Sequence, residues 1–350
     1  MGSITYRKPH VVCLGAPKHA GDDYLASFSQ TFQYSVLPAA DRAETIVGLP
    51  DLIAQRGPID AFVIRMGTPP YEPFDEELLA ALAPTCKIIT SASAGFNEFD
   101  VDWMSRAGIV FCNSVGAVAE ATADMAVFLL LATLRNTSCA ERSAKAGKWR
   151  GGPAGGLIPA RDPAGLTLGI VGMGAIGKHL ARKAAVFNLR IRYYNRRQLP
   201  ASEEDKYGAT YCGSLHELLA SSDIVSLNCP LNEKTTNLIS TAEFDAMRDG
   251  AFLINTARGA VIDETALKVA LGNGKVSRAG LDVLCNEPNV DPWFFEQENV
   301  IVQPHLGGLT DVAYQKAERE CFENIRAYFE TGKANSPVNA DRVEKRVAVE

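Results

Sequence analysis

The stretch Leu168-Gly-Ile-Val-Gly-Met-Gly-Ala-Ile-Gly177 decides the fold, because an apolar run leads directly into spaced glycines. Gly172, Gly174 and Gly177 follow the pattern that lets a strand turn tightly into a helix, lets backbone amides approach a pyrophosphate and packs helix close to strand. Residues 176–184 then keep apolar side chains at helical steps. The flanking strand and helix disfavour the alternative of a glycine-rich turn without a ligand. The stretch therefore predicts a dinucleotide phosphate at a helix N-terminus.

The residues after the next strand predict which dinucleotide is bound. The strand 190–194 is followed by Asn195, Arg196 and Arg197, where an Asp or Glu that binds the adenosine ribose would be expected. Two guanidinium groups beside an amide would instead pair with a ribose phosphate. We therefore expect a preference for NADP(H) over NAD(H), although NAD(H) remains possible. Ordinary solvated charges in a loop are the alternative reading of the two arginines.

Short β-rich runs alternate with helical patterns along the whole chain, which predicts parallel sheets with helices on both faces. The runs form two series: 10–15, 60–66, 86–90 and 109–113, and then 166–171, 190–195, 224–227, 251–255, 279–283 and 300–303. At 350 residues the chain also exceeds the usual size of one core. The sequence therefore predicts an α/β protein with two doubly wound domains. The predicted flavodoxin-like substrate domain comprises residues 1–115 and 305–350. The predicted Rossmann cofactor domain comprises residues 116–304.

Three further segments carry expectations about the domains. Residues 151–156 are rich in glycine and are predicted to form a loop. The pattern over 310–331 predicts a long helix that packs back on the first domain. The helix predicted at 118–135 is more apolar than a solvent-facing helix should be, so we expect it to be buried in a homodimer.

Composition and charge limit the classes of partner that the protein is expected to bind. The net charge is −6 and the basic residues form no cluster, which argues against nucleic acid or a membrane surface as a partner. The apolar run 125–134 is too short to span a bilayer, and the N-terminus lacks an apolar signal core. The eight cysteines are scattered without a CxxC pair, as in a protein with reduced thiols. We therefore expect a cytoplasmic protein with a small-molecule partner.

Polar side chains follow three late strands of the predicted cofactor domain. Arg258, Glu287 and His305 come after the runs 252–257, 281–286 and 300–304. Ligands of open α/β sheets bind beyond the carboxyl ends of the strands. Any one of these residues could belong to a surface ion pair, or to the structure alone, but their joint position favours catalysis.

The motifs around these residues resemble the NAD(P)-dependent D-2-hydroxyacid dehydrogenases, and in particular the glyoxylate/hydroxypyruvate reductase-like or D-mandelate dehydrogenase-like members. The similarity runs from about residue 60 through the final long helix, in order and spacing. The resemblance implies that Arg258 binds the substrate carboxylate and polarises the carbonyl, that His305 transfers the proton, and that Glu287 pairs with the His. The motifs are Asn255-Thr-Ala-Arg-Gly259, Gly280-Leu-Asp-Val283 with Glu287-Pro288, and Pro304-His-Leu-Gly-Gly308.

Physical chemistry agrees with this assignment. When a 2-oxo acid is reduced, negative charge grows on the carbonyl oxygen, so a proton donor is needed within hydrogen-bond reach. A carboxylate beside an imidazole favours the protonated ring and fixes its orientation. The planar guanidinium of Arg258 can grip a carboxylate with two hydrogen bonds, which a lysine cannot do.

The resemblance also implies the residues that line the two ligands. Asp282 should accept a hydrogen bond from the nicotinamide carboxamide, although a helix or turn cap is the alternative. Loops after strands of the first domain should present backbone amides to the substrate, with plain turns as the alternative. The residues expected at the cofactor are Thr122, Gly172, Gly174, Ala175, Ile176, Gly177, Asn195, Arg196, Arg197, Cys229, Pro230, Thr256, Ala257, Asp282, His305 and Gly307. Those expected at the substrate are Gly67, Gly95, Arg258 and His305.

The sequence thus predicts an enzyme that reduces a small 2-oxo acid and oxidises the 2-hydroxy acid in reverse. Glyoxylate, hydroxypyruvate and an aromatic 2-oxo acid are the candidate substrates, and no metal site is expected because the chain lacks the spaced ligands of one. The alternative function is a nucleotide-sensing regulator, similar to the corepressors that resemble this family. Such regulators often carry disordered tails, which the sequence does not show.

Overall fold

The structure is a computed structural model that describes residues 7–149 and 160–347. The predicted loop at 151–156 lies outside the described residues. The chain divides into two compact units, one formed by Met1–Val118 with Thr310–Glu350 and the other by Ala119–Leu309. These divisions fall within a few residues of the boundaries that the sequence predicts.

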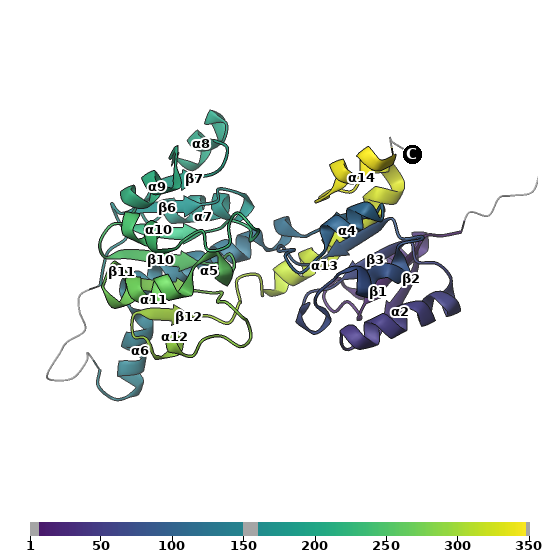
Figure 1. Ribbon diagram of the computed structural model, residues 1–350, viewed down its shortest axis with the longest axis horizontal. Coiled ribbons are helices and arrows are strands. Elements are labelled where there is room, and N and C mark those ends of the chain that lie inside the picture. Colours follow the sequence, from purple (N-terminus) through teal and green to yellow (C-terminus); the bar gives the residue numbers. More distant parts are fainter. Residues whose placement is uncertain (1–6, 150–159, 348–350) are drawn as a thin grey trace, which may run out of the picture. The chain divides into compact units, whose positions relative to one another are not determined.

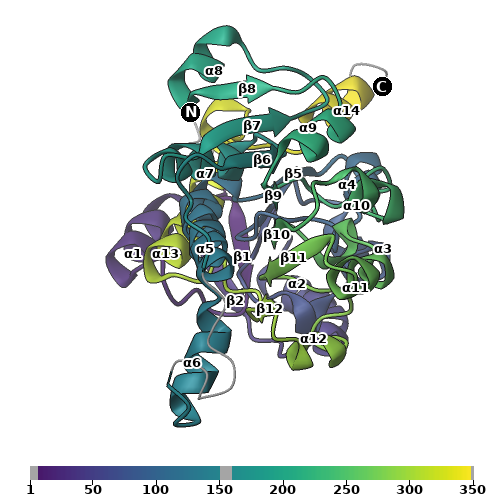
Figure 2. The same ribbon diagram turned by 90° about the vertical axis from the view of Figure 1, so that its left-hand side faces the viewer.

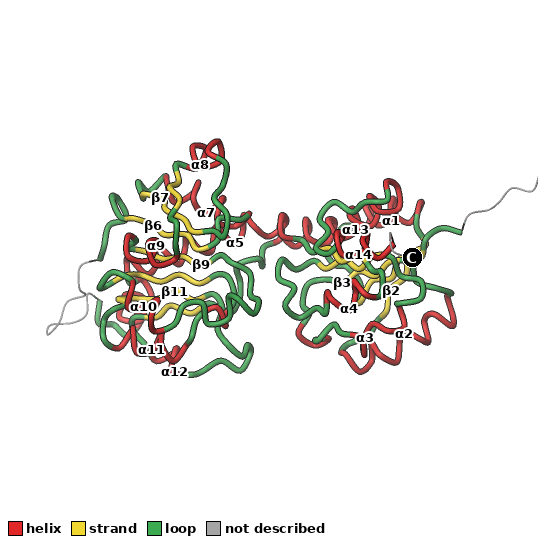
Figure 3. The backbone as a smooth tube through the Cα atoms, turned by 45° about the horizontal axis from the view of Figure 1, so that its top comes forward, coloured by secondary structure: helices red, strands yellow, loops and turns green. Residues whose placement is uncertain are grey.

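The first unit contains a five-stranded parallel sheet in the order β2-β1-β3-β4-β5. Helices cover both faces, and Figure 3 shows them on either side of the strands. Phe28 and Phe322 meet edge to face in the core of one side. The strands are β1 (His10–Leu14), β2 (Gln33–Leu37), β3 (Ala61–Ile64), β4 (Ile88–Ser91) and β5 (Val110–Cys112). The helices are α1 (Asp22–Thr31), α2 (Arg42–Arg56), α3 (Glu76–Leu79), α4 (Val101–Arg106), α13 (Asp311–Thr331) and α14 (Ala340–Val347).

The second unit contains a seven-stranded parallel sheet in the order β12-β11-β10-β9-β6-β7-β8. The strands are β6 (Thr167–Val171), β7 (Arg190–Tyr194), β8 (Ala209–Tyr211), β9 (Ile224–Leu227), β10 (Ala251–Asn255), β11 (Val276–Leu281) and β12 (Val300–Val302). The helices are α5 (Val115–Arg135), which begins in the first unit and continues into the second from Ala119, and then α6 (Thr137–Lys145), α7 (Ala175–Ala185), α8 (Ala201–Tyr207), α9 (Leu215–Ser221), α10 (Thr241–Ala246), α11 (Glu264–Gly272) and α12 (Trp293–Glu296). Figures 1 and 2 show α5 and α7 on one face of this sheet and α10 and α11 on the other.

Two parallel sheets with helices on both faces confirm the predicted fold class. The strands β2 and β8 were not predicted from the sequence, and both are edge strands of their sheets. All but the last residue of β2 are only half-buried, and β8 has three residues, so neither shows the apolar run that marks a central strand. The helices α6 and α14 were also not predicted.

The helix α5 is long and apolar enough to cross a membrane when only length and composition are considered. Half of its most apolar window is buried inside the structure, as in the core helix of a folded domain. Its residues Ala126, Leu129 and Leu130 pack with Ile170 and Ile254 of the sheet. The high hydropathy of α5 therefore reflects, in large part, its place against the second sheet.

Candidate active site

The glycine turn between β6 and α7 has the geometry that a dinucleotide phosphate needs. Gly172 has a φ of +98°, and a Cβ there would lie 2.8 Å from the carbonyl oxygen of Asn228. A Cβ on Gly177 would lie 2.4 Å from the carbonyl oxygen of Gly172, so the helix approaches the turn closely. At Gly174 a Cβ would meet nothing within 4 Å, which leaves open space in front of the helix. Each glycine thus meets one of the three requirements of the motif.

The N-terminus of α7 is free to receive an anion. The helix has no capping side chain and no acidic residue in its first turn, which contains Ala175 and Ile176. Unpaired backbone amides and the helix dipole favour negative charge at such an end. The residues in this part of the structure therefore fit the pyrophosphate of a nicotinamide dinucleotide.

The end of β7 faces the same turn. The side-chain oxygen of Asn195 accepts a hydrogen bond from the Met173 backbone N–H at 2.7 Å, so Asn195 holds the glycine turn. Its amide nitrogen remains a donor. Arg196 and Arg197 follow on the surface, and neither forms an ion pair within the described residues.

The acidic residues of the neighbouring helix α8 are engaged elsewhere. Glu203 pairs with Lys178 at 2.5 Å, and Glu204 accepts hydrogen bonds from Tyr193 at 2.6 Å and from Gln198 at 3.0 Å. The two arginines after β7 therefore keep their positive charge available for a ligand.

Two buried polar atoms without partners mark the ends of β9 and β10. The side-chain oxygens of Asn228 and Thr256 have no hydrogen-bond partner within the described part of the chain. Buried polar atoms of this kind usually signal a missing water or ligand nearby. The predicted residues Cys229 and Pro230 follow Asn228, and Ala257 follows Thr256, so all lie at the same sheet edge. Asn228 was not among the residues predicted from the sequence, although its position directly after a strand could have indicated it.

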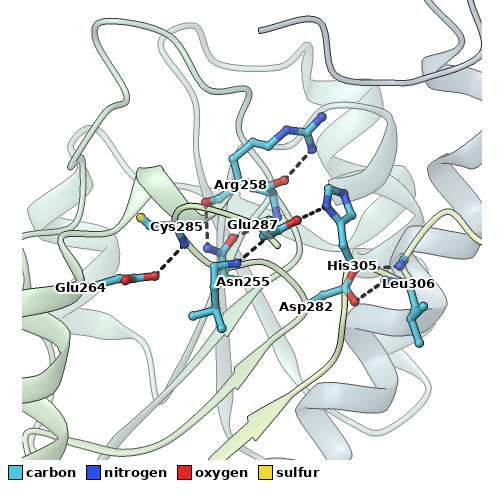
Figure 4. A network of polar contacts seen from close by, with 11 residues as sticks. Asn255, Arg258, Glu264, Asp282, Cys285, Glu287, His305 and Leu306 are labelled. Atoms are coloured by element: carbon cyan, nitrogen blue, oxygen red, sulfur yellow. Dashed lines mark hydrogen bonds and ion pairs between the residues drawn. The ribbon is translucent and has the colours of Figure 1, made fainter. Parts of the chain in front are cut away.

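A backbone turn after β10 carries Arg258. Asn255, which is fully buried, donates to the Arg258 carbonyl at 2.9 Å and accepts from the Ala257 N–H at 3.0 Å. The guanidinium of Arg258 donates to the Ala257 carbonyl at 2.8 Å, which uses one of its donors (Figure 4). The asparagine therefore shapes the turn that presents the arginine.

His305 and Glu287 form a close pair. Figure 4 shows the imidazole of His305 next to the Glu287 carboxylate, with 2.7 Å between Nδ1 and Oε2. The other carboxylate oxygen accepts from the Leu284 N–H at 2.9 Å. Burial alone would raise the pKa of Glu287, but the hydrogen bonds from His305 and Leu284 outweigh it and lower that pKa below its ordinary value. Glu287 is therefore ionised at neutral pH and orients the ring.

Asp282 secures the turn that carries the histidine. It is 2% exposed, and its oxygens accept from the N–H groups of Leu306 and Gly307, each at 2.8 Å. Its backbone carbonyl accepts from the His305 N–H at 2.8 Å. Burial raises the pKa of Asp282, although these hydrogen bonds oppose the rise. The structure thus shows the turn-capping role that the sequence left as an alternative, and a carboxylate keeps further acceptor sites for a carboxamide.

The predicted residues Thr122 and Gly307 lie together beside Asp282. A Cβ on Gly307 would lie 2.8 Å from Asp282 Oδ2 and 3.3 Å from the methyl group of Thr122. Arg258, Glu287, His305 and the predicted cofactor residues therefore all belong to the second unit, at the carboxyl edge of one sheet.

The predicted substrate loops belong to the first unit. Gly67 follows β3 with a φ of +92°, which favours glycine, and Gly95 follows β4. The carbonyl of Gly95 accepts from the Ser93 hydroxyl at 3.1 Å, and that of Ala94 accepts from Asn113 at 2.6 Å. Both loops lie at the carboxyl edge of the five-stranded sheet.

The combination of a glycine turn, a His–Glu pair and an arginine at one sheet edge finds its counterpart in known proteins. The model of the "D-isomer specific 2-hydroxyacid dehydrogenase, NAD binding domain" matches residues 127–307. The chain belongs to this family. The dehydrogenase efuE of Hormonema carpetanum is 56% identical over 337 residues, which are 96% of this chain and 83% of that relative. The protein is accordingly an oxidoreductase that acts on CH–OH donors and binds a nicotinamide cofactor.

Solved structures of family members match both units. A glyoxylate reductase from Paecilomyes thermophila has a TM-score of 0.87 at 36% identity, covering 95% of this chain and 99% of its own. The holo form of Rhodotorula graminis D-mandelate dehydrogenase has a TM-score of 0.86 at 32% identity, covering 95% and 98%. An NADPH-dependent glyoxylate/hydroxypyruvate reductase from Sinorhizobium meliloti, in complex with NADP and malonate, has a TM-score of 0.77 at 28% identity, covering 95% and 97%.

Proposed function

We propose that this 2-hydroxyacid dehydrogenase reduces a small 2-oxo acid to the D-2-hydroxy acid, with His305 as proton donor. In reverse it would oxidise the hydroxy acid, with hydride passing to the oxidised cofactor and the hydroxyl proton to His305. The observation that carries the proposal is the 2.7 Å contact between His305 Nδ1 and Glu287. It commits one ring nitrogen to the carboxylate and leaves Nε2 with no partner among the described residues. That nitrogen is available to a substrate oxygen.

The residues of the chain have distinct tasks in this reaction. The bound nicotinamide supplies the hydrogen and the two electrons of the new C–H bond. Arg258 grips the substrate carboxylate with two N–H groups and stabilises the charge that grows on the carbonyl oxygen. The protonated ring of His305 passes its proton from Nε2 to that oxygen, and Glu287 stabilises the ring while it is charged. Backbone amides of the loops at Gly67 and Gly95 are also proposed to bind the substrate carboxylate.

The relatives point to the substrate class. Glyoxylate and hydroxypyruvate are the substrates in the names of two structural relatives, and a third acts on mandelate, which is aromatic. Steady-state oxidation of NADPH and NADH with glyoxylate, hydroxypyruvate and phenylglyoxylate tests the proposal. Turnover of at least one of these acids is expected. If none is turned over, the alternative of a nucleotide-sensing regulator would be favoured. None of the similar proteins named above is called a regulator.

We further propose a preference for NADP(H), because Arg196 and Arg197 lack carboxylate partners within the described residues and one relative was solved with NADP. Arg196→Asp should weaken NADPH binding by about 10- to 100-fold, since a hydrogen bond to a charged group is lost and a like charge is introduced. The ratio of kcat/KM for NADPH to that for NADH measures this change. Arg190→Asp, at the opposite end of β7, is the matched control. An unchanged ratio in Arg196→Asp would remove this residue from the phosphate site.

The reduction rate should fall with rising pH, because reduction of the oxo acid takes up a proton. Because the pKa of Glu287 is lowered, its carboxylate stays ionised throughout this range and does not cause the fall. In Glu287→Gln the fall should begin at lower pH, because no carboxylate favours the charged ring. The pH dependence of kcat/KM in both proteins checks this result. A flat profile in the wild type would contradict a proton-donating His305.

We also propose that the protein is a cytoplasmic homodimer. Phe128 lies on α5 with half of its surface exposed, and the neighbouring Met125 and Leu131 are only partly buried. A second copy would cover this apolar strip. The eight cysteines are free thiols, which suits a reducing compartment. Sedimentation of the purified protein and its localisation by a fluorescent tag test the two parts separately.

A further inference from the structure

The turn that carries Glu287 is held by two carboxylates. Glu287 itself accepts from the Leu284 N–H at 2.9 Å, while Glu264 accepts from the next backbone N–H, that of Cys285, at 2.7 Å (Figure 4). The two successive N–H groups of this turn thus donate hydrogen bonds to different side chains. One of these side chains, Glu287, is the partner of His305, and the other, Glu264, lies 21 residues before Cys285 in the sequence.

Glu264 is not needed to begin its own helix. It stands in the first turn of α11, where Asp263 already caps the helix by accepting from the N–H groups of Thr265 and Ala266. Glu264 forms no ion pair with a described residue. Its carboxylate points to Cys285. The pKa of the Cys285 thiol is raised to about 12, chiefly by burial and next by the charge of Glu264. The hydrogen bond to the Cys285 N–H is therefore the main contact of the Glu264 carboxylate.

The same peptide bond touches the turn that carries Arg258. A Cβ on Gly259 would lie 2.0 Å from the carbonyl carbon of Leu284 and 2.3 Å from the nitrogen of Cys285. Gly259 therefore packs its backbone directly on the Leu284–Cys285 peptide. A shift of this peptide would move Glu287 on one side and press against the turn of Arg258 on the other.

We propose that Glu264 is a positioning residue of the active site. It holds the Leu284–Cys285 peptide in place, and through it the carboxylate of Glu287 against His305 and the turn of Arg258. The inference rests on the proposed function, because it needs His305 and Glu287 to act in the reaction. It assigns to Glu264 a task that neither the motifs nor the family match provides.

Variants that separate reach, charge and hydrogen bonding test the proposal. Glu264→Ala removes the acceptor, and Glu264→Asp keeps the charge on a side chain too short to reach the Cys285 N–H. Both variants should lower kcat by about 10-fold, because each loses one hydrogen bond to the backbone. Glu264→Gln keeps an oxygen that accepts, so its kcat should match the wild type. In the two impaired variants the alkaline fall of kcat/KM should shift to lower pH, as in Glu287→Gln, while NADPH binding stays unchanged.

Glu217→Ala is the matched control, because Glu217 also stands in the first turn of a helix and accepts from a backbone N–H, that of Gly213, at 2.8 Å. It should lower the melting temperature to a similar extent without changing kcat or the pH profile. If Glu264→Ala and Glu264→Asp behave like this control in an active wild-type background, the inference is overturned. If Glu264→Ala does not fold, the comparison of Asp with Gln still decides. An inactive wild type would instead overturn the proposed function.

Discussion

Replacing His305 with glutamine is expected to lower kcat for 2-oxo acid reduction by about 10²- to 10⁴-fold, the usual contribution of a positioned general acid. Glutamine can hydrogen-bond to Glu287 but cannot give a proton to the substrate. The dissociation constant of NADPH, measured by the fluorescence of the coenzyme, should change little. Steady-state kinetics with saturating NADPH measure the loss.

A second histidine of the chain gives the control for this variant. His216 lies on α9, and its Nε2 is 3.6 Å from Glu243, so it too faces a glutamate. His216→Gln should leave kcat unchanged. Loss of NADPH binding in His305→Gln, together with loss of thermal stability, would mean that His305 serves the structure rather than the reaction.

Arg258→Lys is expected to lower kcat/KM for the oxo acid by about 10- to 100-fold, because an ammonium group makes one charged hydrogen bond where the guanidinium makes two. Arg258→Ala should lower it further. Both changes should appear in KM as well as in kcat, since Arg258 contacts the substrate carboxylate before and during the reaction. Initial rates over a range of oxo acid concentrations separate the two constants.

Arg248→Lys provides a comparison within the same unit, because Arg248 pairs with Asp223 at 2.8 Å, at the start of β9 rather than at a carboxyl strand end. Its kcat/KM should equal that of the wild type. An Arg258→Lys enzyme with an unchanged KM and kcat would show that the substrate carboxylate binds elsewhere.

The parts of the fold that the sequence could predict are those where the backbone admits one residue type. Gly172 adopts a φ that favours glycine and leaves no room for a Cβ, so its spacing from Gly177 is visible without a structure. The order of strands and helices also follows from apolar runs, because central strands of a parallel sheet are buried on both faces. The edge strands β2 and β8 lack that signal.

The sequence predicts which residues form the candidate site, but it does not predict the contacts of those residues. The three polar residues that follow late strands meet because parallel strands end at one edge, which sequence order reveals. The partners of Asp282 and Asn195 are backbone N–H groups that no residue pattern specifies. Glu264 is harder still, since its acceptor role depends on how two separate turns pack at Gly259.

The most direct test of the central claim is a crystal structure of the protein with its coenzyme and a 2-oxo acid analogue that cannot be reduced, such as oxamate. His305 Nε2 is expected to lie within about 2.6–3.2 Å of the oxygen that replaces the reacting carbonyl. The Arg258 guanidinium is expected to hold the analogue's carboxylate. An analogue bound away from both side chains, with the nicotinamide ring remote from His305, would contradict the central claim.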